Sequence, residues 1–253
     1  MKNIILLLTI TASFFACKEN AKEVASETKT DTKTTEMEDN TSIESSDWVS
    51  LFDGSSFDNW RGYLTEDMHA EWTIEDGAMA FTPGTQGGKN IISKDKYTNF
   101  ILSLEWKISE GGNSGIFWGV HEDTTYREAY ETGPEIQVLD NAKHPDAKVA
   151  NGTHTAGSLY DMIAPPADHT NPAGEWNLCV LEVNHTTNLG KVSMNGTELF
   201  TFPIHGADWD AMVANSKFKD WKGFGKYQTG HIGLQDHSDK VWYRNIKIKN
   251  LDK

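Results

Sequence analysis

Short alternating runs joined by tight turns recur through most of this chain, and they restrict its fold more than any other feature. Phe100–Ile108 alternates apolar and polar residues without a break, as a half-buried strand does. Asp76-Gly77 and Asn195-Gly196 each separate two such runs, and these pairs are strong signals for β-hairpin turns. Further strands are expected over Trp72–Glu75, Ala78–Phe81, Ile116–Trp118, Glu135–Leu139, Trp176–Val183, Lys191–Met194, Thr197–Phe202, His231–Gln235 and Val241–Ile248.

One short segment, Asp208–Phe218, is the only stretch of the domain that resembles a helix. Roughly ten to twelve strands with so little helix predict two packed antiparallel sheets. We therefore expect an all-β, concanavalin-like jelly-roll sandwich. A propeller is disfavoured, because no repeat of blade length is present.

The chain divides into a leader, a tether and one domain. Residues 1–16 combine a short positive start with an apolar stretch too short to span a bilayer, which predicts a signal peptide ending before Cys17. Acylation of Cys17 would make this a lipoprotein; the alternative is an ordinary secretory signal followed by a chance cysteine. Residues 17–46 are polar and lack apolar periodicity, as in a disordered tether, and 47–253 form the domain. We expect a cell-envelope protein held by lipid alone, at the outer membrane, in the periplasm or on the surface.

Charge and cysteine content exclude several functions. The formal net charge is −14 and no cluster of Lys and Arg is visible, which argues against nucleic acid as a partner. The chain has two cysteines. If Cys17 is acylated, Cys179 has no partner for a disulfide, and its apolar strand predicts a buried structural thiol.

Glu135–Asp140 is the most informative strand. Ile136 and Val138 point to one face, whereas Glu135 and Gln137 point to the other and Asp140 begins the following turn. The polar face is either half-solvated or the floor of a cleft. Retaining glycosidases need two carboxyl groups about 5–5.5 Å apart. Gln137 and Leu139 occupy the alternate positions where further carboxylates would lie, so double-displacement hydrolysis at this strand is not expected.

Two segments near the C-terminus carry further candidates. His231, Gln235 and His237 share one face of a strand, where they could supply a base or a metal ligand, or simply form an exposed strand end. Arg244 has the same parity as apolar residues of its strand, so it either forms a structural ion pair or reaches the cleft.

Two other segments add polar groups. Asn113-Ser114-Gly115 has the composition of a turn, from which Asn113 could point its amide at a ligand. Tyr160 lies in the expected loops around the cleft, together with His121, His144, His154 and Asp161.

Several motifs in the same order resemble the 3-keto-disaccharide hydrolase family, which is common in lipoproteins of the Bacteroidota. They are Trp48–Gly54 with Trp60, Asn113–Phe117, Glu135–Asp140, Gly157–Asp161, Gly174–Asn177, Gly230–His237 and Tyr243–Ile246. The resemblance covers about 47–251. It implies a concanavalin-like fold and an enzyme that cleaves 3-keto-glycosides, as a hydrolase or as a lyase and hydratase acting through a 2-hydroxy-3-keto-glucal.

This chemistry suggests roles for the candidates. A ketone at C3 acidifies the C2 hydrogen, so one base, Glu135 or His237, could drive elimination of the C1 substituent. A divalent metal bound by Asp140, or Arg244 with Gln137, would polarise the ketone. Substrate contacts are expected from Asn113, Tyr160 and Gln235. The competing classes are a non-catalytic carbohydrate-binding lipoprotein and a protein-interaction sandwich.

Overall fold

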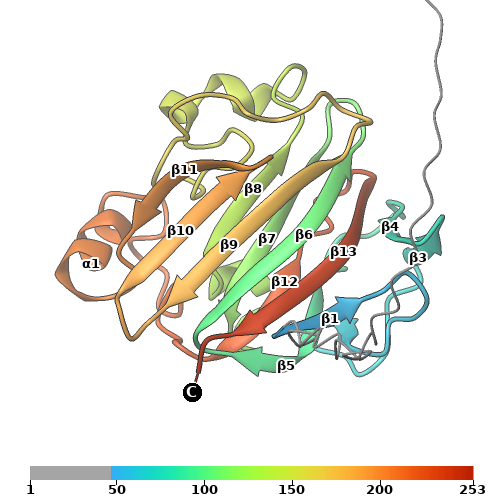
Figure 1. Ribbon diagram of the computed structural model, residues 1–253, viewed down its shortest axis with the longest axis horizontal. Helices are drawn as coiled ribbons and strands as arrows, with labels where there is room; N and C mark the ends of the chain where they lie inside the picture. Colours follow the sequence, from blue (N-terminus) through green and yellow to red (C-terminus); the bar gives the residue numbers. More distant parts are fainter. Residues whose placement is uncertain (1–46, 253) are drawn as a thin grey trace, which may run out of the picture. The chain divides into compact units, whose positions relative to one another are not determined.

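The computed structural model describes residues 47–252, which form two antiparallel sheets (Figure 1). The larger sheet has eight strands in the order β11-β10-β9-β6-β13-β4-β3, and β1 also pairs with β13. Its strands are β1 (Trp48–Phe52), β3 (Trp72–Glu75), β4 (Ala78–Phe81), β6 (Phe100–Ile108), β9 (Asn177–Asn184), β10 (Leu189–Met194), β11 (Thr197–Phe202) and β13 (Val241–Asn250).

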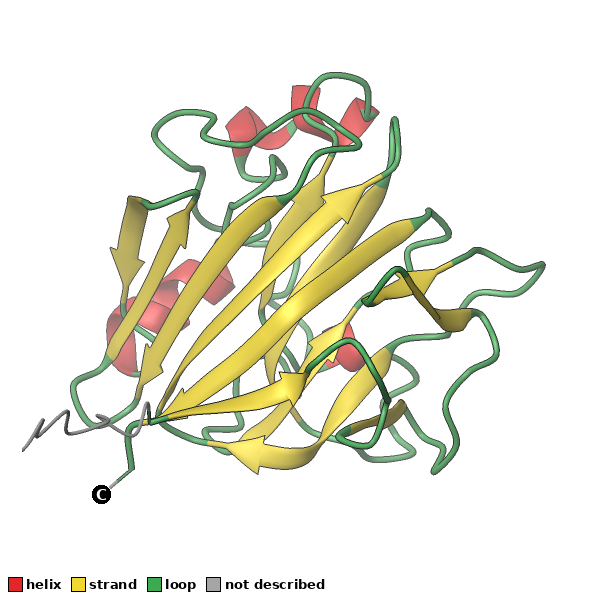
Figure 2. Ribbon diagram, turned by 45° about the vertical axis from the view of Figure 1, so that its right-hand side comes forward, coloured by secondary structure: helices red, strands yellow, loops and turns green. Residues whose placement is uncertain are grey.

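The smaller sheet has five strands in the order β2-β5-β12-β7-β8. They are β2 (Trp60–Gly62), β5 (Ile91–Tyr97), β7 (Asn113–Val120), β8 (Glu135–Leu139) and β12 (Gly230–Leu234). Strands dominate the molecule, and helical turns occur only in connections (Figure 2). Those turns are α1 (Gly206–Ala214), η1 (Ala129–Glu131), η2 (Pro145–Lys148) and η3 (Ala150–Gly152). The predicted all-β jelly-roll sandwich with one short α-helix is thus confirmed for the described residues.

The helix ends earlier than the sequence predicted. It covers Gly206–Ala214 rather than Asp208–Phe218. Asn215 ends it by donating from Nδ2 to the Ala211 carbonyl oxygen at 2.8 Å, and Phe218 lies in the loop beyond. This early end matters for function, because it leaves Lys217 and Phe218 in an irregular segment that reaches a cavity.

The core lies between the two sheets and follows the alternation of the strands. Leu104 and Trp106 of β6 are each 1% exposed, and Ile136 and Val138 of β8 are fully buried. Burying apolar surface in this way contributes about 25 cal/mol per Å². Cys179 is also in this core, as its apolar strand predicted.

Both hairpin turns form as predicted. Asp76 and Gly77 have φ of 49° and 74°, and Asn195 and Gly196 have φ of 51° and 83°. Positive φ at both central residues gives the twist that joins neighbouring antiparallel strands. These turns fix the register of β3 with β4 and of β10 with β11.

A loop segment extends the smaller sheet beyond β8. Leu159 forms an isolated bridge with Ile136, and Gly157 donates its backbone N–H to the Gln137 carbonyl oxygen at 2.8 Å. Tyr160 donates likewise to the Glu135 carbonyl oxygen at 3.0 Å. The segment therefore protects the free edge of β8 and holds Tyr160 beside Glu135.

The predicted signal peptide, the predicted acylation of Cys17 and the predicted tether lie outside the described residues. Within residues 47–252, no helix has the length and apolar character needed to cross a membrane.

Candidate functional site

A cavity of about 290 Å³ lies on the face of the smaller sheet that points away from the core. The strands and the segment after β12 contribute Asn113, Glu135, Gln137, Gln235 and His237 to its lining. Loops contribute Tyr130, Tyr160, Lys217, Phe218 and Trp221. Six residues chosen from the sequence thus meet here: Asn113, Glu135, Gln137, Tyr160, Gln235 and His237.

Glu135 lies at the floor of the cavity and is only 6% exposed. Its side chain crosses Gly115 of β7, where a Cβ would collide with Glu135 Oε1 and lie 2.7 Å from Cδ. Burial raises the pKa of Glu135 to about 8, although the charge of Lys217 lowers it in part. Such a carboxyl is a stronger base than an exposed one once it is ionised.

Asn113-Ser114-Gly115, interpreted from the sequence as a turn, is instead the first part of β7. These residues pair with Leu139, Val138 and Gln137 of β8 and are buried. The absence of a side chain at Gly115 gives the Glu135 carboxyl its space. Asn113, Ser114 and Gly115 therefore form part of the cavity floor and do not form a turn.

Gln137 connects this floor to Glu135. In the amide orientation that satisfies its surroundings, its nitrogen donates to the Ser114 carbonyl oxygen at 2.8 Å and to Glu135 Oε1 at 3.1 Å. Gln137 is 1% exposed. Its position next to the carboxyl makes it a positioning group for Glu135.

Lys217 supplies the cation that sequence reasoning missed. Its Nζ lies 4.1 Å from the centre of the Tyr160 ring, within range of a cation–π contact. The residue is exposed overall, yet partial burial of its ammonium lowers its pKa, while Glu135, Asp161 and Asp146 oppose that shift. Lys217 is therefore suited to give up a proton within the cavity.

Asp161 fixes this part of the cavity wall. Its Oδ2 accepts the Lys217 backbone N–H at 2.7 Å, and its Oδ1 lies 2.8 Å from His154 Nε2. The His154 ring in turn stacks on Tyr160 at 4.3 Å. Asp161 adopts a φ of 62°, and the contacts around it hold this uncommon conformation.

Two buried amide oxygens face the cavity without a partner. Among the described residues, nothing forms a hydrogen bond with Asn113 Oδ1 or Gln235 Oε1. The two residues are 2% and 7% exposed. Buried polar atoms are nearly always paired, so these oxygens are ready acceptors for ligand hydroxyl groups.

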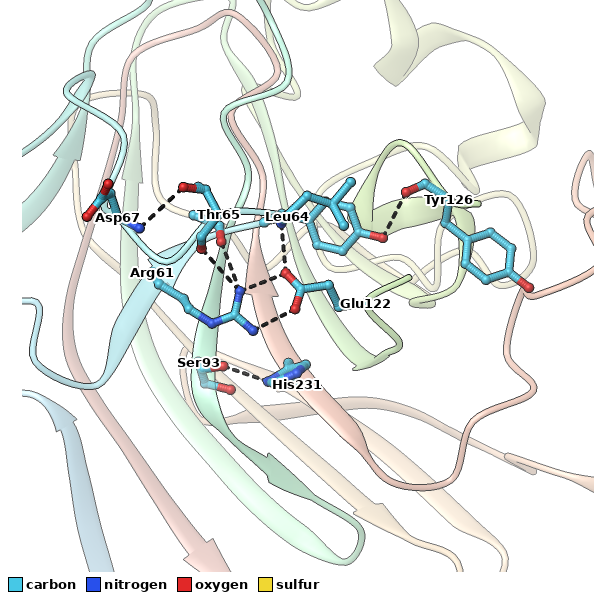
Figure 3. A network of polar contacts seen from close by, with 10 residues as sticks. Arg61, Leu64, Thr65, Asp67, Ser93, Glu122, Tyr126 and His231 are labelled. Carbon is cyan, nitrogen blue, oxygen red and sulfur yellow. Dashed lines mark hydrogen bonds and ion pairs between the residues drawn. The ribbon is translucent and has the colours of Figure 1, made fainter. Parts of the chain in front are cut away.

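His237 stands at the exposed rim of the cavity, with its ring 6.4 Å from that of His144. His231, expected on the same polar face, lies elsewhere because the register shifts between His231 and Gly233. Its Nδ1 is 2.7 Å from the Ser93 carbonyl oxygen, beside the Arg61–Glu122 ion pair (Figure 3). Only Gln235 and His237 of this group line the cavity.

Arg244 lies outside the cavity. Asn245, with a φ of 52°, forms an irregularity in β13 that reverses the alternation, so Arg244 faces outward while Ile246 is buried. Its Nη2 lies 2.7 Å from Glu105 Oε2, and its guanidinium lies 4.0 Å from the Trp176 ring centre. Of the two alternatives for Arg244, the structure supports the ion pair, and substrate contact at this cavity is not supported.

Arg244→Met is therefore expected to retain wild-type turnover. The ion pair is partly exposed, so its loss should reduce the free energy of unfolding by about 1 kcal/mol or less. Steady-state kinetics and urea unfolding of the two proteins measure both effects. A loss of turnover without unfolding would instead place Arg244 in the reaction.

Asp140 holds the turn after β8. Its Oδ2 accepts the Gly111 N–H at 2.7 Å, and its Oδ1 accepts the Ala142 N–H at 3.1 Å. Within residues 47–252, no group of three or more His, Cys, Asp or Glu side chains is arranged to hold a metal ion. The described residues around Asp140 therefore do not fit a metal centre.

Jelly-roll sandwiches include lectin domains, which bind carbohydrates. The relatives of this chain show that it is a glycoside-cleaving enzyme. More narrowly, residues 47–249 match the model of the 3-keto-α-glucoside-1,2-lyase-like domain, and the chain belongs to that family. The family predicted from the sequence motifs is thereby confirmed.

Known relatives agree with this placement. A 3-keto-disaccharide hydrolase of Bacteroides thetaiotaomicron is 35% identical over 262 residues, covering 93% of this chain and 89% of the relative. A structure from Parabacteroides distasonis, provisionally described as a glycosyl hydrolase, is 30% identical with a TM-score of 0.73, covering 81% of this chain and 94% of that one. A second structure from the same organism, with the same description, is 25% identical with a TM-score of 0.62, covering 81% and 99%.

Proposed function

We propose that this enzyme cleaves 3-keto-glycosides by β-elimination and then adds water to complete a net hydrolysis. The observation that carries this proposal is the single carboxyl of the cavity. Among the described residues that line it, Glu135 is the only Asp or Glu. Double-displacement hydrolysis needs a second carboxyl group about 5–5.5 Å away, whereas elimination beside a ketone needs one base.

Glu135 is the base in this scheme. Its carboxylate removes the C2 proton, which the C3 ketone makes acidic, and the released electron pair forms an enolate between C2 and C3. Collapse of the enolate restores the C3 carbonyl, forms a C1–C2 double bond and expels the C1 oxygen. Water then adds its oxygen to C1, and C2 regains a proton, so the products are the 3-keto-sugar and the free leaving group.

The remaining cavity residues have complementary roles. Lys217, whose pKa is lowered by burial, donates a proton to the departing C1 oxygen. The ring of His237 donates a hydrogen bond to the negatively charged C3 oxygen, and the amide oxygens of Asn113 and Gln235 accept from the ring hydroxyls and orient them. These residues take the place first considered for Arg244, which lies outside the cavity.

The reaction itself can be tested by isotope incorporation. Cleavage of a 3-keto-disaccharide in D₂O should place one solvent deuterium at C2 of the 3-keto-glucose product, because C2 loses and regains a proton. Incubation of 3-keto-glucose alone with the enzyme measures later exchange. Cleavage without deuterium at C2, or equal cleavage of the disaccharide that lacks the ketone, would show that the proposal is wrong.

The pH dependence should follow the ionisation of Glu135. The base must be ionised, so kcat/KM should rise with pH through about 8, the raised pKa of this carboxyl. Lys217→Met removes the charge that lowers this pKa, so the rising limb should move to higher pH as the maximum falls. The exposed Lys219 of the same loop provides the control, Lys219→Met, with an unchanged profile.

The sign of that limb is decisive. If kcat/KM fell as pH rose through about 8, the active form of Glu135 would be the protonated acid. If the rising part of the kcat/KM profile stayed at the same pH in Lys217→Met, the charge of Lys217 would not influence the pKa of Glu135.

A further inference from the structure

A second cavity adjoins the first. It has a volume of about 510 Å³ and is lined in part by Tyr126, Glu131, Asp220 and Lys222. Tyr130 and Trp221 line both cavities, and the centres of their rings are 5.9 Å apart. The two aromatic rings therefore form a shared boundary between the cavities.

The first cavity is small. Its volume of about 290 Å³ lies just below the ~300–1,000 Å³ range of ligand pockets. A disaccharide whose 3-keto ring lies over Glu135 has further space for its leaving sugar in the adjoining second cavity of about 510 Å³.

The positions along β8 indicate which way the leaving sugar extends. Asn113 lies opposite Leu139, at the C-terminal end of β8. Tyr130, in η1, precedes the N-terminal end of β8, where Glu135 is the first residue. The boundary to the second cavity is thus at the Glu135 end, and the unpartnered amide of Asn113 is at the other.

The wall of the second cavity is held in place before any ligand arrives. Tyr63 Oη donates to the Tyr126 carbonyl oxygen at 3.2 Å, and the Tyr126 and Tyr227 hydroxyls are 3.3 Å apart. A Cβ at Gly223 would lie 2.7 Å from Tyr126 Cζ, so the ring packs closely against the backbone there. Such preorganisation reduces the entropy lost on binding.

The lining also defines the chemistry of an occupant. Tyr126, Tyr130 and Trp221 offer aromatic faces for the apolar side of a sugar ring. Glu131 already accepts backbone N–H groups from Arg127 and Glu128, which leaves Asp220 and Lys222 for ligand hydroxyls. Two carboxylates against one ammonium disfavour an anionic group.

We propose that this second cavity binds the leaving glycosyl unit of the substrate as a neutral sugar. The inference rests on the proposed cleavage of 3-keto-glycosides and assigns a binding site to the leaving sugar. Selectivity for a disaccharide over a simple glycoside would then arise largely beyond Tyr130 and Trp221.

Two substrates that share the 3-keto ring test this assignment. Tyr126→Ala and Lys222→Ala should each lower kcat/KM for a 3-keto-α-glucosyl-glucose about tenfold relative to methyl 3-keto-α-glucoside, which lacks the leaving sugar. Lys219→Ala, an exposed residue of the same loop outside both cavities, is the matched control and should leave the ratio unchanged.

The possible results distinguish a wrong assignment of the second cavity from a wrong assignment of the reaction. An unchanged ratio in both variants, or an equal loss for both substrates, would overturn the assignment of the second cavity while leaving the proposed reaction intact. Failure of the wild-type enzyme to cleave either substrate would overturn the proposed function itself.

Discussion

Replacing Glu135 by glutamine should reduce kcat by about 100- to 10,000-fold, which is the usual contribution of a general base. Glutamine has nearly the same shape, so it can occupy the space over Gly115, and its carbonyl oxygen can still accept from Gln137. It cannot remove the C2 proton. Single-turnover kinetics with a 3-keto-disaccharide would measure the loss in the chemical step.

The same substitution should stabilise the folded protein at neutral pH. Burial raises the pKa of Glu135 from 4.5 to about 8, so folding favours the protonated form. The stability that this preference provides is complete below the unfolded pKa of 4.5 and is lost as pH rises to about 8. Glutamine does not ionise, so it should recover on the order of 3 kcal/mol near pH 7.

Denaturant unfolding at two pH values checks this sign. The stabilisation by Glu135→Gln should be small near pH 5 and larger near pH 8. Glu105→Gln is the control, because Glu105 pairs with Arg244 outside the cavity. Wild-type turnover in Glu135→Gln would contradict the role of Glu135 as the base. A variant that lost stability relative to the wild-type protein as pH rose would contradict the raised pKa of this buried carboxyl.

Regular alternation made much of the fold predictable. The runs over Phe100–Ile108 and Glu135–Leu139 became β6 and β8 with the same bounds, because the alternate apolar side chains of each strand pack into the core between the sheets. β2 and β5 were not anticipated. Trp60–Gly62 has only three residues, and Ile91–Tyr97 lacks alternation, so neither carries a local signal strong enough to identify a strand.

The strands made the floor of the site predictable, and Tyr160 is the one loop residue of the lining that the sequence also indicated. Glu135 and Gln137 share a face by parity, and this face is part of the cavity lining. Lys217 and Trp221 come from an irregular loop, and tertiary contacts such as the Asp161–Lys217 hydrogen bond decide their position. Arg244 was misplaced because the irregularity at Asn245 reverses the alternation, and one Asn gives little warning of it.

Gly115→Ala should reduce turnover by about 100-fold or more while leaving the fold intact, since general base catalysis contributes at least that much. A Cβ at this position would collide with Glu135 Oε1 and lie 2.7 Å from Cδ and 2.9 Å from Cγ. The Glu135 side chain must therefore move, and the base leaves its place over β7. Because Gly115 does not have positive φ, alanine introduces no backbone strain.

Kinetics and unfolding together distinguish this effect from general damage. Alanine is favoured over glycine inside a strand by roughly 0.5–1 kcal/mol, which partly offsets the cost of moving Glu135. Gly87→Ala is the control, because a Cβ there meets nothing within 4 Å. Loss of turnover with cooperative unfolding retained would indicate that Gly115 serves the placement of the base. Wild-type turnover in Gly115→Ala would mean that Glu135 does not act from the position it occupies over β7.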